Sequence, residues 1–129
     1  MVKNIVISKD NHIESYGYTG TIASLNMGKI ENCVNNADVI GANTFAGGIC
    51  GYMVNGYGTI ENCKNYGNVS AMTYAAGICG GSQSGASLTV YNYLVNECEN
   101  HGNMSTKNGV GSAGIAASFS GAVKNCTNY

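Results

Sequence analysis

The chain has 129 residues, of which 44% are hydrophobic, so it can form one domain with a modest core. Six lysines, no arginine and seven acidic residues give a net charge of -1, which supplies no basic surface for nucleic acid or for an anionic membrane. No apolar run approaches the roughly 18 residues needed to span a bilayer, and the apolar stretch at the start is too short for a secretory signal.

One four-residue phrase recurs along the whole chain. It reads VKNI at residues 2–5, IENC at 30–33 and again at 60–63, VNEC at 95–98 and VKNC at 123–126. Its last position falls at residues 5, 33, 63, 98 and 126, so the successive steps are 28, 30, 35 and 28. Self-similarity at such a period is typical of repeat architectures, and here it indicates a unit of about 28 residues with insertions.

A second phrase follows the first in each unit. It reads GTIA at residues 20–23, GGIC at 47–50, AGIC at 76–79 and AGIA at 113–116, always 16 to 18 residues after the first phrase. Each unit is therefore expected to contain about three short extended segments, and no stretch shows the apolar spacing of a helix.

Turn residues lie between the two phrases, as in NYGNV at 65–69 and NHGNM at 100–104. Asn and Gly tolerate a positive φ, so these residues predict a corner followed by a new short strand. The high glycine count, 19 of 129, agrees with a turn-rich β protein.

A unit of this size cannot bury its own apolar face, whereas stacked units can. The sequence therefore predicts an all-β fold, a right-handed parallel β-solenoid (β-helix), with the handedness taken from the rule for parallel crossovers. The expected single domain spans residues 1–129 and holds about four Gly-rich repeats of 28–35 residues. Their predicted bounds are about 2–28, 29–58, 59–93, 94–121 and a partial 122–129.

The phrases AGGICG at 46–51 and AAGICGG at 75–81, alternating with IENC, resemble the GLUG-type repeat region of bacterial cell-surface and secreted proteins. The first unit departs most from the pattern, because Ile5 replaces the cysteine, Ile7 replaces a recurrent asparagine and the corner glycine is missing. Atypical terminal units commonly act as caps. The resemblance implies extracellular or cell-surface, structural or adhesive work, with the chain a fragment or mature piece because it carries no signal.

The cysteines are expected to form columns, because equivalent residues of stacked units lie one strand spacing apart, roughly 4.8 Å. The first column is Cys33, Cys63, Cys98 and Cys126, and the second is Cys50 and Cys79. A straight column cannot surround a zinc ion, and no Cys-x-x-Cys is present, so no metal or other cofactor is predicted. Ile5, Ala23 and Ala116 hold equivalent positions, which favours buried free thiols over disulfides; disulfides remain an alternative.

Four asparagines each follow a cysteine of the first column by two residues. They are Asn35, Asn65, Asn100 and Asn128. Stacked amides can pass hydrogen bonds from unit to unit and satisfy corner backbone groups, so a structural ladder is predicted.

Residues suited to catalysis are few. Glu31 and Glu61 hold equivalent positions, and paired carboxylates near 5 Å are the geometry of retaining glycosidases. Alternation of apolar and polar residues, however, places both on the solvent face of a strand. His12 and His101 are the only histidines available as a base for a cysteine nucleophile. His101 holds a corner position that is Asn36 or Tyr66 in other units, so it is expected at the surface. The prediction is that the protein is not an enzyme.

The insertion at residues 82–94 is the most individual stretch, and loops that break a solenoid's period often carry its binding surface. It contains Tyr91 and Tyr93, and the matching loop one unit earlier contains Tyr52 and Tyr57. Exposed tyrosines stack on sugars or anchor protein partners, so these four are the candidate contact residues. The alternative is that they cover the flank of the solenoid.

The favoured function is a non-catalytic structural or adhesive repeat segment of a bacterial surface or secreted protein. Its expected partners are a glycan or a host or cell-surface protein, with no nucleic acid and no membrane insertion. One alternative is a subunit that stacks head to tail into a filament, since the phrases at residues 2–5 and 123–126 differ only in their last residue. A second is a carbohydrate-binding or carbohydrate-active β-helix.

Overall fold

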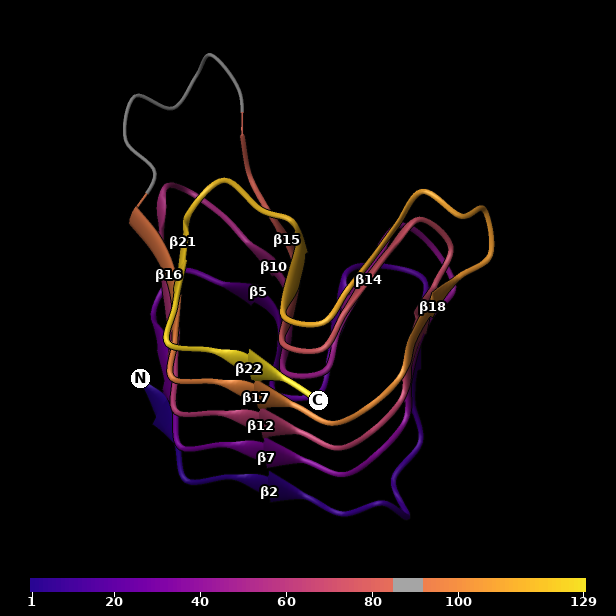
Figure 1. Cartoon of the computed structure of the whole chain (residues 1–129), viewed down its shortest axis with the longest axis horizontal. Helices are drawn as coiled ribbons and strands as arrows, with labels where there is room; N and C mark the ends of the chain where they lie inside the picture. The colour runs from indigo at the N-terminus through magenta and orange to yellow at the C-terminus, as the bar shows by residue number, and fades with distance from the viewer. Residues whose placement is uncertain (85–91) are drawn as a thin grey trace.

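A computed structural model describes residues 1–84 and 92–129 of the chain. These residues form 22 short strands and no helix. Every strand pair is parallel, and the strands wind into successive coils stacked along one axis (Figure 1). The protein is a parallel β-solenoid, as the sequence predicted.

Five sheets run along the axis, each built from equivalent strands of successive coils. The first sheet holds β1 (Val2–Lys3), β6 (Lys29–Glu31), β11 (Tyr57–Glu61), β16 (Asn92–Asn96) and β21 (Ala122–Lys124). The second holds β2 (Val6–Ile7), β7 (Val34–Asn35), β12 (Lys64–Asn65), β17 (Glu99–Asn100) and β22 (Thr127–Asn128). The third holds β3 (Ile13–Ser15), β8 (Val39–Gly41), β13 (Val69–Ala71) and β18 (Met104–Thr106). The fourth holds β4 (Thr19–Gly20), β9 (Phe45–Gly47), β14 (Tyr74–Ala76) and β19 (Gly111–Ala113). The fifth holds β5 (Ala23–Asn26), β10 (Cys50–Met53), β15 (Cys79–Ser82) and β20 (Ala116–Ser118).

Each complete coil thus has five strands, whereas the sequence suggested about three extended segments. One additional corner, between the fourth and fifth sheets, comes from a close approach of the backbone, because a Cβ atom at Gly48 would overlap the carbonyl of Gly77. The corner that the sequence did predict, between the second and third sheets, is equally close. A Cβ atom at Gly67 would overlap the carbonyl of Ala37, and one at Gly102 would overlap the carbonyl of Gly67. These corner glycines therefore serve to let neighbouring coils touch, and not to supply the positive φ that the sequence suggested.

The positive φ lies instead at the third residue of the recurrent phrase, where the chain passes from the first sheet to the second. Its value is between 50° and 61° in all five copies. The residues are Asn4, Asn32, Asn62, Glu97 and Asn125. Asparagine tolerates this left-handed conformation better than most residues, which explains four of the five.

The core has two parts, and each fills one lobe of the solenoid's cross-section. The first lobe is enclosed by the first, second and fifth sheets, and the second lobe lies between the third and fourth sheets. The larger contains the cysteines together with Ile30, Ile49, Ile60 and Ile78. The smaller contains Val39, Ala46, Val69, Ala71 and Ala75. Their small side chains allow the third and fourth sheets to approach closely, which makes the second lobe thin (Figure 1).

Candidate functional site

The fourth and fifth sheets, which hold β14 and β10, meet at an angle on the outside of the solenoid (Figure 1). Tyr52 of β10 lies at this angle, because its ring packs against Phe45 of β9 in the fourth sheet. There it joins Tyr18, Phe45 and Tyr74 in what we call the aromatic cluster. The Tyr18 and Tyr52 rings stack with centroids 4.5 Å apart, and Phe45 and Tyr74 stack at 4.8 Å. Phe45 also lies 4.8 Å from Tyr52, which joins the two stacks. The cluster is a continuous aromatic surface that spans three coils.

Strand alternation places these rings outside the core. Ala46 and Ala75 are fully buried in the smaller core, so their neighbours Phe45 and Tyr74 point to the opposite face. In the fifth sheet, Cys50 and Met53 are buried and Tyr52 is half-buried. Burial raises the pKa of the Tyr52 hydroxyl above its usual range, with a smaller contribution from Tyr18, so this phenol stays protonated at neutral pH.

The cluster stops at the fourth coil, where glycine replaces the aromatic residue. Gly111 pairs with Tyr74 in register, and a Cβ atom at Gly111 would lie 2.8 Å from the Tyr74 ring. A cavity of about 230 Å³ opens at this point, lined by Tyr74, Val110, Gly111, Ser112, Ala113 and Ala117. At the other end, Tyr18 lines a second cavity of about 250 Å³ with Gly17, Asn43 and Thr44.

The four predicted tyrosines do not form one site. Tyr57 is 61% exposed, away from the aromatic cluster at the start of β11, and Tyr91 lies outside the described residues. Tyr93 is only 2% exposed, so the expectation of an exposed contact residue is corrected. Its hydroxyl accepts a hydrogen bond from the Gly56 amide at 2.8 Å and its ring packs against Phe119, because its strand turns this side chain into the larger core.

Three members of the cluster were not predicted from the sequence, although the repeat pattern carries a signal for them. Tyr18, Phe45 and Tyr74 each stand four residues before the isoleucine of the second phrase, and Gly111 holds the same place in the fourth unit. The aromatic surface could have been found by extending the repeat alignment to this position. Its junction with Tyr52 could not, because the two positions lie on different sheets.

The four recurrent asparagines form a ladder, which we call the inner ladder, with Asn35, Asn65 and Asn100 buried and Asn128 exposed at its end. Each Nδ2 donates to the Oδ1 of the next coil at 2.8 to 2.9 Å, from Asn35 through Asn65 and Asn100 to Asn128. The first three amides also bond backbone groups at their own corners, as Asn65 Nδ2 does to the Gly67 carbonyl at 2.8 Å. This arrangement satisfies the polar groups of the three buried side chains, which is a structural role.

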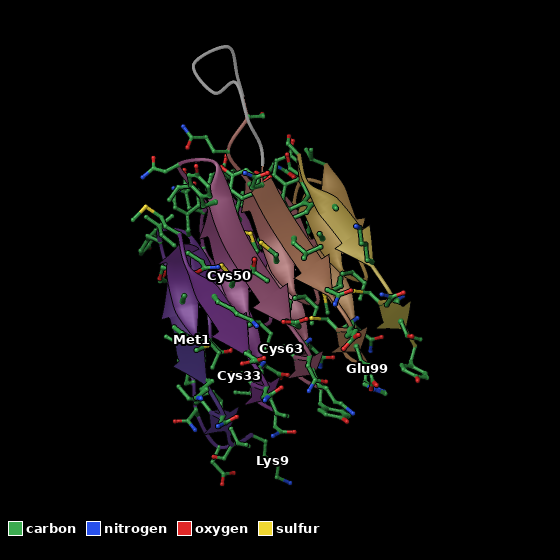
Figure 2. The ribbon with its side chains drawn as sticks, turned by 90° about the vertical axis from the view of Figure 1, so that its left-hand side faces the viewer. Met1, Lys9, Cys33, Cys50, Cys63 and Glu99 are labelled. Carbon is green, nitrogen blue, oxygen red and sulfur yellow. The ribbon has the colours of Figure 1, made fainter. Side chains whose placement is uncertain are left out.

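All six cysteines are free, and five of them are buried. Cys33 and Cys63 follow one another in successive coils, and Cys50 belongs to a separate column (Figure 2). Each thiol lies within reach of a backbone carbonyl near its own corner; Cys63 Sγ, for example, is 3.3 Å from the Glu61 carbonyl oxygen. Cys79 is fully buried, and contact with Cys50 together with burial raises the pKa of its thiol well above the usual range. The pKa of the Cys63 thiol is instead lowered, mainly by its hydrogen bond with Cys98, but Cys63 is fully buried. Burial is the feature of structural thiols here, since a reactive cysteine needs access as well as a lowered pKa.

Glu31 and Glu61 are paired in register on the first sheet, as the repeat suggested. Lys29 Nζ lies between them, 3.2 Å from Glu31 Oε1 and 2.8 Å from Glu61 Oε2. The hydrogen bond from Lys29 lowers the pKa of Glu61, with a further contribution from Asn96. A glycosidase general acid needs a raised pKa, so Glu61 has the opposite electrostatics.

His101 stands in an exposed aromatic row on the second sheet. It stacks on Tyr66 at 4.6 Å and on Tyr129 at 4.2 Å. Its Nε2 is 3.2 Å from Glu99 Oε2, and Lys64 Nζ is 3.4 Å from the same oxygen. His12 is highly exposed and lies 2.8 Å from Glu14. Within residues 1–84 and 92–129, the side-chain hydrogen bonds of both histidines go to glutamates and none to a cysteine.

Among residues 1–84 and 92–129, no group of three or more His, Cys, Asp or Glu side chains is arranged to hold a metal ion. The same residues contain no helix long and apolar enough to cross a membrane. Comparisons with protein-family models, curated proteins and solved structures find no match to the chain. The resemblance to GLUG-type repeats therefore stays a prediction.

Proposed function

We propose that the chain is a non-catalytic structural and adhesive repeat segment of a bacterial surface or secreted protein, with the aromatic cluster as its contact surface. The observation that carries the proposal is the position of Tyr18, Phe45, Tyr52 and Tyr74. Four rings lie together on the outside of the solenoid, at a point where strand alternation would equally have allowed small or charged residues.

A glycan is the ligand that this surface suits best. Tyrosine offers an apolar ring to the C–H face of a sugar and a hydroxyl to its polar groups. Within the two stacks the rings cover one another, and the ring of Tyr74 is left open where Gly111 replaces the next aromatic residue and the cavity of about 230 Å³ lies. A protein partner anchored by aromatic contacts is the second possibility.

The other side-chain groups support a structural role. The buried asparagines and the cysteines make their hydrogen bonds inside the protein, and Lys29 bridges the paired glutamates. Extracellular or cell-surface location belongs to the same proposal, because it rests on the repeat pattern.

Glycan-array binding, followed by titration of the best ligand, tests the proposal. Tyr18→Ala and Tyr52→Ala should each weaken binding about tenfold, which corresponds to roughly 1.4 kcal/mol. Tyr57→Ala is the matched control, because Tyr57 is 61% exposed and lies outside the cluster. If Tyr57→Ala loses binding and the cluster variants keep it, the binding site lies at Tyr57 and not in the cluster. The absence of any glycan or protein ligand would refute the proposal.

A further inference from the structure

The loop between β18 and β19 is longer than the equivalent loops of the other coils. It holds four residues, 107–110, whereas the others hold two or three. Figure 1 shows this segment, drawn in orange after β18, reaching farther outward than the loops of the other coils. All four residues are exposed, and a Cβ atom at Gly109 would meet nothing within 4 Å. The loop is therefore open to solvent.

Two hydrogen bonds orient the side-chain amide of Asn108 within this loop. Its Oδ1 accepts a hydrogen bond from the Val110 amide at 3.3 Å, and its Nδ2 donates to Thr73 Oγ1 at 3.1 Å. An asparagine side chain that bonds the main chain two residues on is folded back over the intervening peptide. This conformation brings Asn108 Cγ close to the amide nitrogen of Gly109.

The amide nitrogen of Gly109 is available to attack this carbon atom. Within residues 1–84 and 92–129 it donates no hydrogen bond. Glycine has no Cβ atom that would obstruct the approach, and a nucleophile held in the same chain acts as if it were highly concentrated. The Val110 amide, already bonded to Asn108 Oδ1, stabilises the negative charge that this oxygen gains during the attack.

We infer that Asn108 is a site of intramolecular deamidation, with water as the co-reactant. The Gly109 nitrogen loses its proton to solvent and forms a bond to Asn108 Cγ. The bond from Cγ to Nδ2 breaks, and ammonia leaves with a proton taken from solvent. Water then opens the resulting succinimide ring at either of its carbonyl groups, which gives aspartate or isoaspartate at position 108. The net change is hydrolysis of the side-chain amide, with no oxidation or reduction.

The other Asn-Gly pair of the sequence lies where this reaction is hindered. Asn55 and Gly56 belong to the turn between β10 and β11, and Gly56 is buried. The Gly56 amide donates a hydrogen bond to the Tyr93 hydroxyl at 2.8 Å. A nitrogen held in a buried hydrogen bond must lose that bond before it can attack, and the loss costs free energy. Asn55 should therefore persist while Asn108 converts.

The conversion would change the surface beside the aromatic cluster. It adds a negative charge to the loop, and isoaspartate adds a methylene group to the main chain just before Gly109. Val110 of the same loop lines the cavity of about 230 Å³ at Tyr74. The wall of this cavity thus carries a slow, irreversible chemical change. The inference concerns the chemistry of Asn108 alone and does not depend on ligand binding at the cluster.

Peptide mapping by mass spectrometry, during incubation of the full chain at mildly alkaline pH, tests the inference. In the folded wild type, Asn108 should convert to aspartate and isoaspartate at least about tenfold faster than Asn55. In denaturant the two sites should convert at similar rates, because the hydrogen bond to Tyr93 is gone. In the folded protein, Tyr93→Phe should accelerate the conversion of Asn55 about fivefold to tenfold, the value of one hydrogen bond, and leave Asn108 unchanged.

Two glycine substitutions form a matched pair. Gly109→Ala adds a methyl group that meets no other atom but obstructs its own nitrogen, so conversion of Asn108 should slow about tenfold. Gly17→Ala adds the same group in open space in the equivalent loop of the first coil, and both rates should stay unchanged. Far-ultraviolet circular dichroism should show all variants folded. Equal rates at Asn108 and Asn55 in the folded wild type would overturn the inference. So would an Asn108 that stays intact there while both sites convert in denaturant.

Discussion

Two rows of asparagine run along the solenoid, and they follow different rules. The inner ladder is fully buried in the middle coils, and each member bonds both the next amide and its own corner. The outer row consists of the exposed residues with positive φ at the third position of the recurrent phrase. It is bonded from coil to coil in part, as between Asn62 Nδ2 and Asn32 Oδ1 at 2.7 Å. The row is Asn4, Asn32, Asn62, Glu97 and Asn125.

The substitutions that each row accepts show what it requires. The inner ladder departs from asparagine only at Ile7, in the first coil. The outer row departs in the middle, at Glu97, where φ is 53°. A buried amide must satisfy its own polar atoms and its neighbours', whereas an exposed one needs only to tolerate the backbone conformation. The inner ladder should therefore be the costlier row to change.

The largest effect is expected at the glycine that packs on the inner ladder. A Cβ atom at Gly77 would overlap the carbonyl of Gly114 and the side chain of Asn100. Gly77→Ala should lower the free energy of unfolding by about 3 kcal/mol or more, because backbone and a bonded amide cannot both move aside. Chemical denaturation measures it. Gly17→Ala, where a Cβ atom meets nothing within 4 Å, should change stability by about 0.5 kcal/mol or less.

The two rows can be compared directly with one substitution in each. Asn65→Leu should cost about 2–4 kcal/mol, because it leaves buried polar groups of its neighbours without a partner. Asn62→Leu should cost about 1 kcal/mol, the penalty of a bulky residue at positive φ. Equal losses in the two variants, measured by urea denaturation, would contradict the distinction.

The cysteine column repeats the contrast between buried and open positions. Cys63 is fully buried and Cys126 lies half-buried at the end of the column. Cys63→Ala should cost about 1–2 kcal/mol, and Cys126→Ala about 0.5 kcal/mol or less. A thiol reagent should count six cysteines after denaturation and react first with Cys126 in the folded protein. A count of two or fewer would indicate disulfides.

The smallest effect is a gain in stability. Glu97→Asn places the residue preferred at positive φ in the middle of the outer row, next to Asn62 and Asn125, and should stabilise the protein by about 0.5–1 kcal/mol. Glu97→Gln removes the same charge but not the conformational strain, so it should have almost no effect. A gain of the same size from glutamine would assign the effect to charge.

Much of this organisation could be predicted from the sequence because in-register parallel stacking turns a repeat into a column. Cys50 and Cys79 are paired because they hold one position in successive units, and Asn35, Asn65 and Asn100 lie in one ladder for the same reason. The five strands of each coil were not predicted, since the added corners depend on contacts between coils.

The residues of the sequence thus determined the fold class and every neighbour along the axis. The tertiary structure alone decided the neighbours around the coil. It turned Tyr93 inward to the Gly56 amide, and it brought Phe45 of the fourth sheet against Tyr52 of the fifth. The physical reason is that axial contacts follow from the repeat period, whereas lateral contacts depend on the angles at the corners, which backbone packing sets.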